Sequence, residues 1–354
     1  MNIKKRFLSI FLLVSLLFSL TGCQKSSSTD YKSAITKNGF YFDTVVSISV
    51  YDQKDEALLD DCMDICKTYD ALLSRTNPDS DISQLNNALA NGQPGYTVST
   101  DTAALIKDAL DYYKKSDGAF DITLLPVSLL WDFTGKHPHV PDSSSLSSAL
   151  QRVDAKKVSV TGDTVSAAPG QEIDLGGIAK GFIADKLKEY LEENGCKSGF
   201  INLGGNVLLV GSKGNEDFTV GLRYPYKDDN SIIARVKASD LSIVTSGCYE
   251  RYFEENGQKY HHILDPKTGM PVENHLLSVT ILSKSSTDGD ALSTSCYVMG
   301  YKKAKKWIEK TPGVEAVFIF DDYSLASTSG VQIDKNQVIT LTSPETVSAS
   351  AASR

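Results

Sequence analysis

Two adjacent glycines and a lysine, Gly176, Gly177 and Lys180, give the sequence its clearest potential for binding a phosphate. The preceding residues alternate as in a strand and residues 183–191 recur at helical spacing, so the glycines lie where a strand gives way to a helix. The first N–H groups of such a helix lack internal partners, and glycine lets a phosphate approach them closely. Asp174 could accept a hydrogen bond from a base or sugar hydroxyl. A tight turn with a surface lysine is the alternative, because the P-loop and dinucleotide spacings are absent.

A second concentration of acid–base groups lies at His261 and His262, which precede Asp265 and a Pro/Gly turn. The imidazole of His262 can accept a proton near neutral pH, which makes it a candidate general base. The alternative is a histidine at a strand edge that packs against a tyrosine and has no chemical role.

Asp290 and Thr294 are four residues apart at the start of a predicted helix, so they share one face. A carboxylate and a hydroxyl oxygen suit a hard cation such as Mg²⁺, which takes few protein ligands and completes its shell with phosphate and water. Capping of the helix by Asp288 or Asp290 is the alternative. His137 and His139 could also bind a metal, but the prolines around them favour an exposed loop.

Composition is that of an ordinary globular protein: 354 residues, 41% hydrophobic and 23% charged. The net charge of −8, with a pI near 5.2, argues against a nucleic-acid binder, since no basic patch follows the N-terminal leader. Apart from Cys23, five widely spread cysteines remain, which predicts no disulfide framework. Cys62 and Cys66 lie one helical turn apart and are expected to be buried.

The N-terminus has the anatomy of a bacterial lipoprotein signal over residues 1–22. Basic residues 4–6 precede an apolar run too short to span a membrane, and Cys23 directly follows Leu-Thr-Gly. Acylation of Cys23 would hold the chain on the outer face of the cytoplasmic membrane. An ordinary secretory signal with an incidental cysteine is the alternative. Residues 23–37 then form a tether, 38–342 one catalytic unit, and 343–354 a disordered tail.

The pattern between these ends predicts an α+β fold with a largely antiparallel core and helices packed outside it. We expect helices at 56–73, at 100–115 with Thr100 or Asp101 as cap, after the glycines up to Gly195, from about 287, and at 302–310. We expect strands at 40–50, 157–160, 164–166, 200–206, 207–210, 218–222, 232–236, 242–245, 277–282 and 316–320.

Eight stretches, in order, resemble the FAD:protein FMN transferase family, also called the ApbE family. They are Phe42-Asp43-Thr44, Leu73-Ser74, residues 80–86, Gly118-Ala119-Phe120-Asp121 with Thr123, Asp174 to Gly181, Asn202 to Asn206, Thr245-Ser246-Gly247, and His262 to Gly269 with Asp290 to Thr294. The resemblance implies a T-fold-like barrel and an exported, often lipid-anchored, Mg²⁺-dependent enzyme. Such an enzyme splits FAD, attaches FMN to a threonine hydroxyl of a target protein and releases AMP. Acceptors in the family belong to membrane or extracellular electron-transport systems.

The resemblance also assigns roles to residues of this sequence. His262 matches the proposed base, and Gly177, Asp290 and Thr294 match the metal positions. Contacts to FAD carry over to Phe42, Thr76, Ala119, Phe120, Asp121, Asp174, Lys180 and Ile263. Phe42 stands where the family often has methionine, and Thr76 where some members have tyrosine, so these two contacts depart from the family pattern.

Three other functions are compatible with parts of the pattern. A flavin-carrying electron-transfer lipoprotein would need a tight cage or an acceptor threonine in a Ser/Thr-Gly-Ala-Thr-like context, and no convincing acceptor is present. A solute-binding lipoprotein would have two parallel α/β lobes, whereas this chain becomes strand-rich after Lys197. An FAD pyrophosphatase would use water in place of the protein acceptor.

Overall fold

The computed structural model describes residues 31, 33–227 and 231–342, which belong to one compact unit. Its centre is an eight-stranded sheet in which every neighbouring pair is antiparallel. In spatial order the strands are β1 (Ile35–Tyr41), β2 (Thr44–Val50), β6 (Ser198–Leu203), β7 (Asn206–Gly211), β10 (Ser242–Gly247), β13 (Leu276–Ser283), β14 (Glu315–Phe320) and β15 (Leu325–Ser327). Within the described residues β1 and β15 do not pair, so the sheet is open and the implied barrel is not closed.

A four-stranded sheet packs against one face of the large sheet. Its order is β16 (Val331–Ile333), β17 (Val338–Leu341), β9 (Ile232–Ala238) and β8 (Phe218–Arg223), and β17 and β9 are parallel. Alternate residues of β8 are buried and pack with Val207 and Leu209 of β7. Because β8 is last in the strand order, it is an edge strand of this sheet. The smaller strands are β3 (Gly95–Thr97), β4 (Ser159–Thr161), β5 (Thr164–Ser166), β11 (Tyr252–Glu255) and β12 (Gln258–His261).

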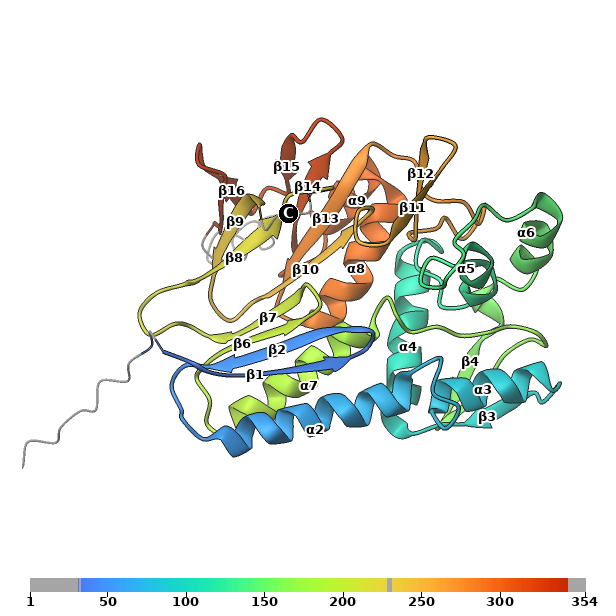
Figure 1. Ribbon diagram of the computed structural model, residues 1–354, viewed down its shortest axis with the longest axis horizontal. Coiled ribbons are helices and arrows are strands. Elements are labelled where there is room, and N and C mark those ends of the chain that lie inside the picture. The colour runs from blue at the N-terminus through green and yellow to red at the C-terminus, as the bar shows by residue number, and fades with distance from the viewer. Residues whose placement is uncertain (1–30, 32, 228–230, 343–354) are drawn as a thin grey trace, which may run out of the picture. The chain divides into compact units, whose positions relative to one another are not determined.

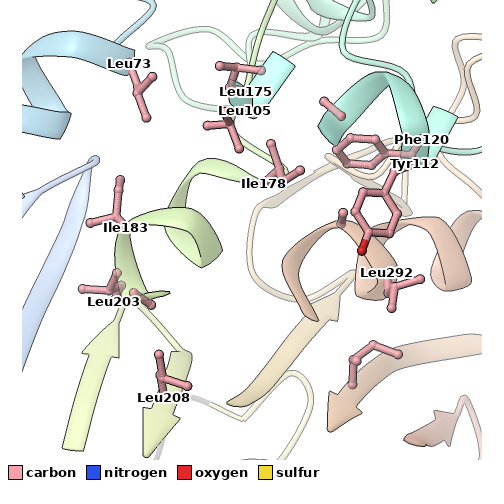
Figure 2. Packing of buried hydrophobic residues seen from close by; sticks show 14 of the residues in the cluster. Leu73, Leu105, Tyr112, Phe120, Leu175, Ile178, Ile183, Leu203, Leu208 and Leu292 are labelled. Atoms are coloured by element: carbon pink, nitrogen blue, oxygen red, sulfur yellow. The ribbon is translucent and has the colours of Figure 1, made fainter. Parts of the chain in front are cut away.

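Helices cover the other face and one end of the large sheet (Figure 1). They are α2 (Glu56–Leu73), α3 (Asp81–Ala90), α4 (Thr100–Lys115), α5 (Leu125–Trp131), α6 (Ser143–Leu150), α7 (Ala179–Glu193), α8 (Ser286–Met299) and α9 (Tyr301–Ile308), with a short 3₁₀ turn at Ala155–Lys157. Figure 2 shows side chains of α2, α4, α7, α8 and the β6–β7 hairpin gathered in one buried cluster. Full burial of each large side chain, such as Ile183, stabilises the fold by roughly 1.5–3 kcal/mol.

The junction of α7 and α8 depends on one glycine and one carboxylate. A Cβ on Gly181 would lie 2.2 Å from the carbonyl oxygen of Ser286, so only glycine permits this close approach. Asp185 of α7 accepts hydrogen bonds from the N–H groups of Ser286 (2.7 Å) and Thr287 (2.9 Å). These contacts satisfy two of the N-terminal N–H groups of α8 and fix the helix against α7.

Several elements differ from the sequence-based expectation. Residues 40–50 are not one strand, because Phe42 and Asp43 adopt positive φ (57° and 56°) and turn β1 back into β2. β1 begins at Ile35, so residues 35–37 belong to the sheet and not to a tether. The side chain of Ser99, and not Thr100 or Asp101, caps α4.

Other expectations are confirmed. α2 has the predicted bounds, and α7 ends before Gly195, whose φ is positive. Cys62, Cys66 and the other described cysteines are free and buried. Within the described part of the chain, no helix is both long and apolar enough to cross a membrane. The predicted signal, Cys23 and the tail at 343–354 lie outside the described residues.

Candidate active site

A cleft of about 1130 Å³ brings together side chains from distant parts of the sequence. It lies where the glycine turn before α7, the start of α8, the β1–β2 turn and the segment after β12 meet. Twelve residues to which the family resemblance gives a role line it: Phe42, Thr76, Ala119, Phe120, Asp121, Asp174, Gly177, Lys180, His262, Ile263, Asp290 and Thr294. The sequence-based set therefore forms one site.

The carboxylate of Asp290 is buried, with 5% of the residue exposed. Its Oδ2 accepts a hydrogen bond from the N–H of Gly181 at 2.9 Å, and within the described residues this is its only hydrogen-bond or ion-pair partner. Ser285 is the N-cap of α8, so the alternative in which Asp288 or Asp290 caps the helix is wrong. A buried carboxylate without a cationic side chain is costly unless something else balances its charge.

Thr294 and Gly177 contribute further oxygen atoms to the lining of the same cleft. The hydroxyl of Thr294, one turn along α8, is 3.1 Å from Oγ of Ser246, which also lies 2.8 Å from Oγ of Ser293. A Cβ on Gly177 would be 3.9 Å from the Thr294 hydroxyl and 3.0 Å from the Phe120 ring, so the glycine backbone reaches this point because it has no side chain. Among the described residues, no cluster of three His, Cys, Asp or Glu could hold a metal. A cation here would depend on mixed oxygen donors.

Charged side chains surround the glycine turn. Oδ1 of Asp174 accepts a hydrogen bond from the N–H of Gly176 at 2.8 Å, and Arg75 lies 3.9 Å from the other carboxylate oxygen. The Lys180 ammonium donates to the carbonyl of Gly176 at 3.3 Å, so its charge lies over the turn. Residues 167–178 separate β5 from α7, so no strand leads directly into the glycines as the sequence had suggested.

The remaining predicted flavin contacts differ in what they can offer. The carboxylate of Asp121 accepts bonds from the N–H (2.8 Å) and hydroxyl (2.5 Å) of Thr123, and burial raises its pKa, so it mainly fixes its own loop. Phe120 is buried and lies edge-on to Tyr112 (Figure 2). Phe42 donates its N–H to Asp70 at 2.9 Å, and Thr76 is exposed at the rim.

His262 is half-buried on the wall of the cleft. Its Nδ1 lies 3.2 Å from the carbonyl oxygen of Arg251, so Nδ1 carries the proton and Nε2 is left as an acceptor. Burial, and then the positive charge of Arg251, lower the pKa of His262 to about 3, so the ring is neutral at physiological pH. The histidine that packs on a tyrosine is its neighbour His261, which is edge-on to Tyr297.

The cleft also contains groups that the sequence did not single out. Arg223, Glu250 and Arg251 line it, and burial raises the pKa of the Glu250 carboxyl. Ser246 stood within a recognised motif but had no role until its contact with Thr294 was visible. Arg223 lies in no motif, and only the position of β8 against the cleft reveals it. The His137–His139 segment is an exposed loop outside the cleft, as expected.

Comparison with known proteins identifies the family of this chain. A sequence model of the ApbE family matches residues 42–318. A relative from Treponema pallidum (strain Nichols), named FAD:protein FMN transferase, is 35% identical over 317 residues, which cover 84% of this chain and 87% of the relative. A relative of the same name from Klebsiella pneumoniae (strain 342) is 35% identical over 295 residues and covers 82% and 86%.

Solved structures agree as well. The ApbE protein of Thermotoga maritima superimposes with a TM-score of 0.76 at 31% identity, covering 84% of this chain and 97% of that one. The flavin transferase ApbE from Vibrio cholerae has a TM-score of 0.74 at 26% identity, covering 84% and 98%. With a family match over most of the sequence and the same fold in solved members, the chain belongs to the ApbE family.

Proposed function

We propose that this protein transfers FMN from FAD to a threonine hydroxyl of a target protein and releases AMP. The observation that carries the proposal is the convergence of twelve residues from six separate segments on one cleft of about 1130 Å³. The name FAD:protein FMN transferase, shared by the relatives, supports the same reaction. The acceptor that fits is a flavoprotein of a membrane or extracellular electron-transport system, and nucleic acid is not a partner.

The reaction exchanges the phosphoanhydride bond of FAD for a phosphoester bond to threonine. The threonine oxygen forms a bond to the phosphorus of the FMN half, the bond from that phosphorus to the bridging oxygen breaks, and AMP leaves with that oxygen. The hydroxyl proton passes to Nε2 of His262, whose ring is neutral at physiological pH. A pKa of about 3 makes the ring a weak base, and the negative charge of a bound diphosphate would raise that pKa. The carbonyl of Arg251 keeps the ring in the tautomer that leaves Nε2 free.

Preorganised positive groups can stabilise the negative charge that develops on the diphosphate oxygens. The Lys180 ammonium lies over the glycine turn, and the positive end of the α7 dipole follows that turn. The N–H groups of Ile178 and Ala179 already bond to the carbonyl of Leu175, so they do not bind the phosphate. Preorganised groups of this kind are each worth about 10²–10³ in rate. Because Gly181 already donates its N–H to Asp290, that group supports the carboxylate and does not bind the phosphate.

The donor set fits Mg²⁺. Asp290 has a buried carboxylate with no cationic partner among the described residues, and Mg²⁺ needs only one or two carboxylates beside neutral oxygens. Asp290, the Thr294 hydroxyl and a backbone oxygen of Gly177 would hold it. When bound there, such an ion would supply Lewis-acid stabilisation of charge on the phosphate oxygens. Ser246 fixes the direction of the Thr294 hydroxyl through its 3.1 Å contact.

The experiment that tests the function measures both products. Purified enzyme is incubated with FAD, Mg²⁺ and membranes from a strain that lacks the enzyme, and AMP release and in-gel flavin fluorescence are followed. We expect AMP and one or more covalently fluorescent bands in equal amounts. AMP with no labelled protein would identify a pyrophosphatase, and bound FAD with no AMP would identify a flavin carrier. Either result would overturn the transferase proposal.

We also propose that Cys23 is acylated and holds the enzyme on the outer face of the cytoplasmic membrane. The lipoprotein pattern of residues 1–23 supports this proposal. Cells grown with labelled palmitate should incorporate label into the unchanged protein and not into Cys23→Ser. Equal labelling of both would refute lipidation at this residue.

A further inference from the structure

The edge of β8 that faces the cleft has no assigned role. Five consecutive residues of this strand, Thr219 to Arg223, line the same cavity as Asp290 and Thr294. Successive side chains of a strand point to opposite faces, so a cavity that touches five residues in a row lies alongside the backbone edge. β8 is the last strand of its sheet, and within the described residues it pairs only with β9.

The ladder shows which backbone groups of β8 point into the cleft. Gly221 stands opposite Arg235 of β9, and the N–H of Arg235 bonds to Gln337 on the far side, away from β8. The two residues are therefore a non-hydrogen-bonded pair, and the N–H and C=O of Gly221 point away from β9. Thr219, two residues earlier and opposite Lys237, has the same orientation.

The side chains along this edge leave the backbone of β8 accessible to another polypeptide chain. Val220 and Leu222 are buried against the core, whereas Thr219 and Gly221 are exposed. Gly221 accommodates the side chain of Ile232 on β9, since a Cβ there would lie 2.7 Å from Cγ2 of Ile232. It therefore places no side chain of its own beside its outward N–H and C=O. Native proteins usually cover or blunt free edges, so an uncovered edge inside a cleft is a place for strand addition.

The cleft connects this edge to the reactive centre. Thr245 and Ser246 of β10 line the same cleft, and the Ser246 hydroxyl is 3.1 Å from that of Thr294. The volume of about 1130 Å³ also exceeds the roughly 300–1,000 Å³ typical of a pocket for one small molecule. A dinucleotide and a short extended chain can therefore share it.

We propose that the acceptor protein presents its threonine on an extended segment that pairs with β8 as an added strand. Backbone bonds to Thr219 and Gly221 would hold the segment, and its threonine would point along the cleft toward the diphosphate. This inference rests on the proposed transferase function and identifies how its protein substrate docks. Backbone bonds would supply affinity, and the choice of acceptor sequence would depend on the side chains next to the reacting threonine.

The test removes one backbone N–H that points away from β9, without disturbing the ladder between β8 and β9. Thr219→Pro removes a donor that does not bond to β9 and places a ring on the open edge, a position that tolerates proline. Thr219→Val keeps the N–H and is the matched control. With membranes of the deletion strain as acceptor, we expect Thr219→Pro to need at least about tenfold more membrane for half-maximal flavin incorporation. Its FAD affinity, measured by flavin fluorescence, should stay within about twofold, and the control should behave as the unchanged enzyme.

The outcomes separate the two proposals. Transfer by Thr219→Pro at the unchanged membrane requirement would overturn strand addition and leave the transferase standing. Equal loss of FAD affinity would assign the β8 edge to the dinucleotide instead, and no transfer by the unchanged enzyme would overturn both proposals. Deuterium exchange gives a measure that needs no variant: solubilised acceptor with FAD should slow exchange at residues 218–223. Unaltered exchange there would also overturn the inference.

Discussion

Replacing Asp290 with asparagine removes one negative charge and almost no volume. The asparagine Oδ1 can still accept the N–H of Gly181, so the contact between α8 and α7 survives. In the absence of metal the buried carboxylate has no cationic partner among the described residues, and its neutral replacement costs no stability. We therefore expect Asp290→Asn to be at least as stable as the unchanged enzyme in a metal-free buffer.

Added Mg²⁺ should then distinguish the two proteins. A ligand at 100 times its Kd stabilises the folded state by about 2.7 kcal/mol. With roughly 2–4 °C per kcal/mol for domains of 150–250 residues, and less for this larger unit, the unchanged enzyme should gain about 5 °C in Tm. Asp290→Asn should gain almost nothing, and its rate of flavin transfer should fall by at least about 10²–10³-fold, which corresponds to ~3–4 kcal/mol of lost transition-state stabilisation.

The matched control is Asp288→Asn, two residues earlier on the same helix. Asp288 accepts a hydrogen bond from Tyr112 at 2.5 Å and does not line the cleft, so its replacement removes the same charge outside the site. Differential scanning fluorimetry with and without Mg²⁺ gives the shift, and AMP release gives the rate. A normal Mg²⁺ shift or full transfer activity in Asp290→Asn would refute the assignment of this carboxylate to the metal.

Four further variants examine the base and the helix junction. His262→Ala should bind FAD normally but transfer flavin about 10²–10⁴-fold more slowly, and unchanged turnover would exclude it from the mechanism. Because the folded-state pKa of His262 is about 3, below the unfolded value near 6.5, the unfolded chain binds a proton first as the pH falls. Stability should therefore drop between pH 6.5 and 3, less steeply in His262→Gln, as measured by urea unfolding; parallel curves would contradict the shift. Gly181→Ala should lower the free energy of unfolding by about 1–3 kcal/mol or more, since its Cβ would lie 2.2 Å from the Ser286 carbonyl oxygen. The control is Gly205→Ala, because nothing lies within 4 Å of a Cβ there and only the cost of the positive φ is measured.

Residue patterns predicted most of the helices and strands, because hydrophobic residues recur with a regular spacing in both. α2 matched to the residue, and β8 to β10 were each found with bounds short by a few residues at one end. The hairpin at Phe42 and Asp43 was missed, since neither residue is the glycine or asparagine that normally marks such a turn. α3 was missed because a polar cluster precedes it and hides its Ser80 cap.

The site was predicted from family motifs, and contacts between distant segments were not. Nothing local in the sequence indicates that Asp185 caps α8 or that Ser246 lies beside Thr294, because these pairs are joined only by the fold. The same is true of Arg223 and the open edge of β8, which depend on how two sheets pack. Motifs therefore named residues that line the cleft, while their supporting contacts have to be observed.

The bond between Gly181 and Asp290 joins positions 109 residues apart in the chain. One contributes the backbone that follows the glycine turn, and the other the carboxylate suited to a cation. If both are needed for the proposed reaction, a nascent or half-folded polypeptide should release no AMP from FAD. The chain would then become catalytically competent only once this part of the fold is complete.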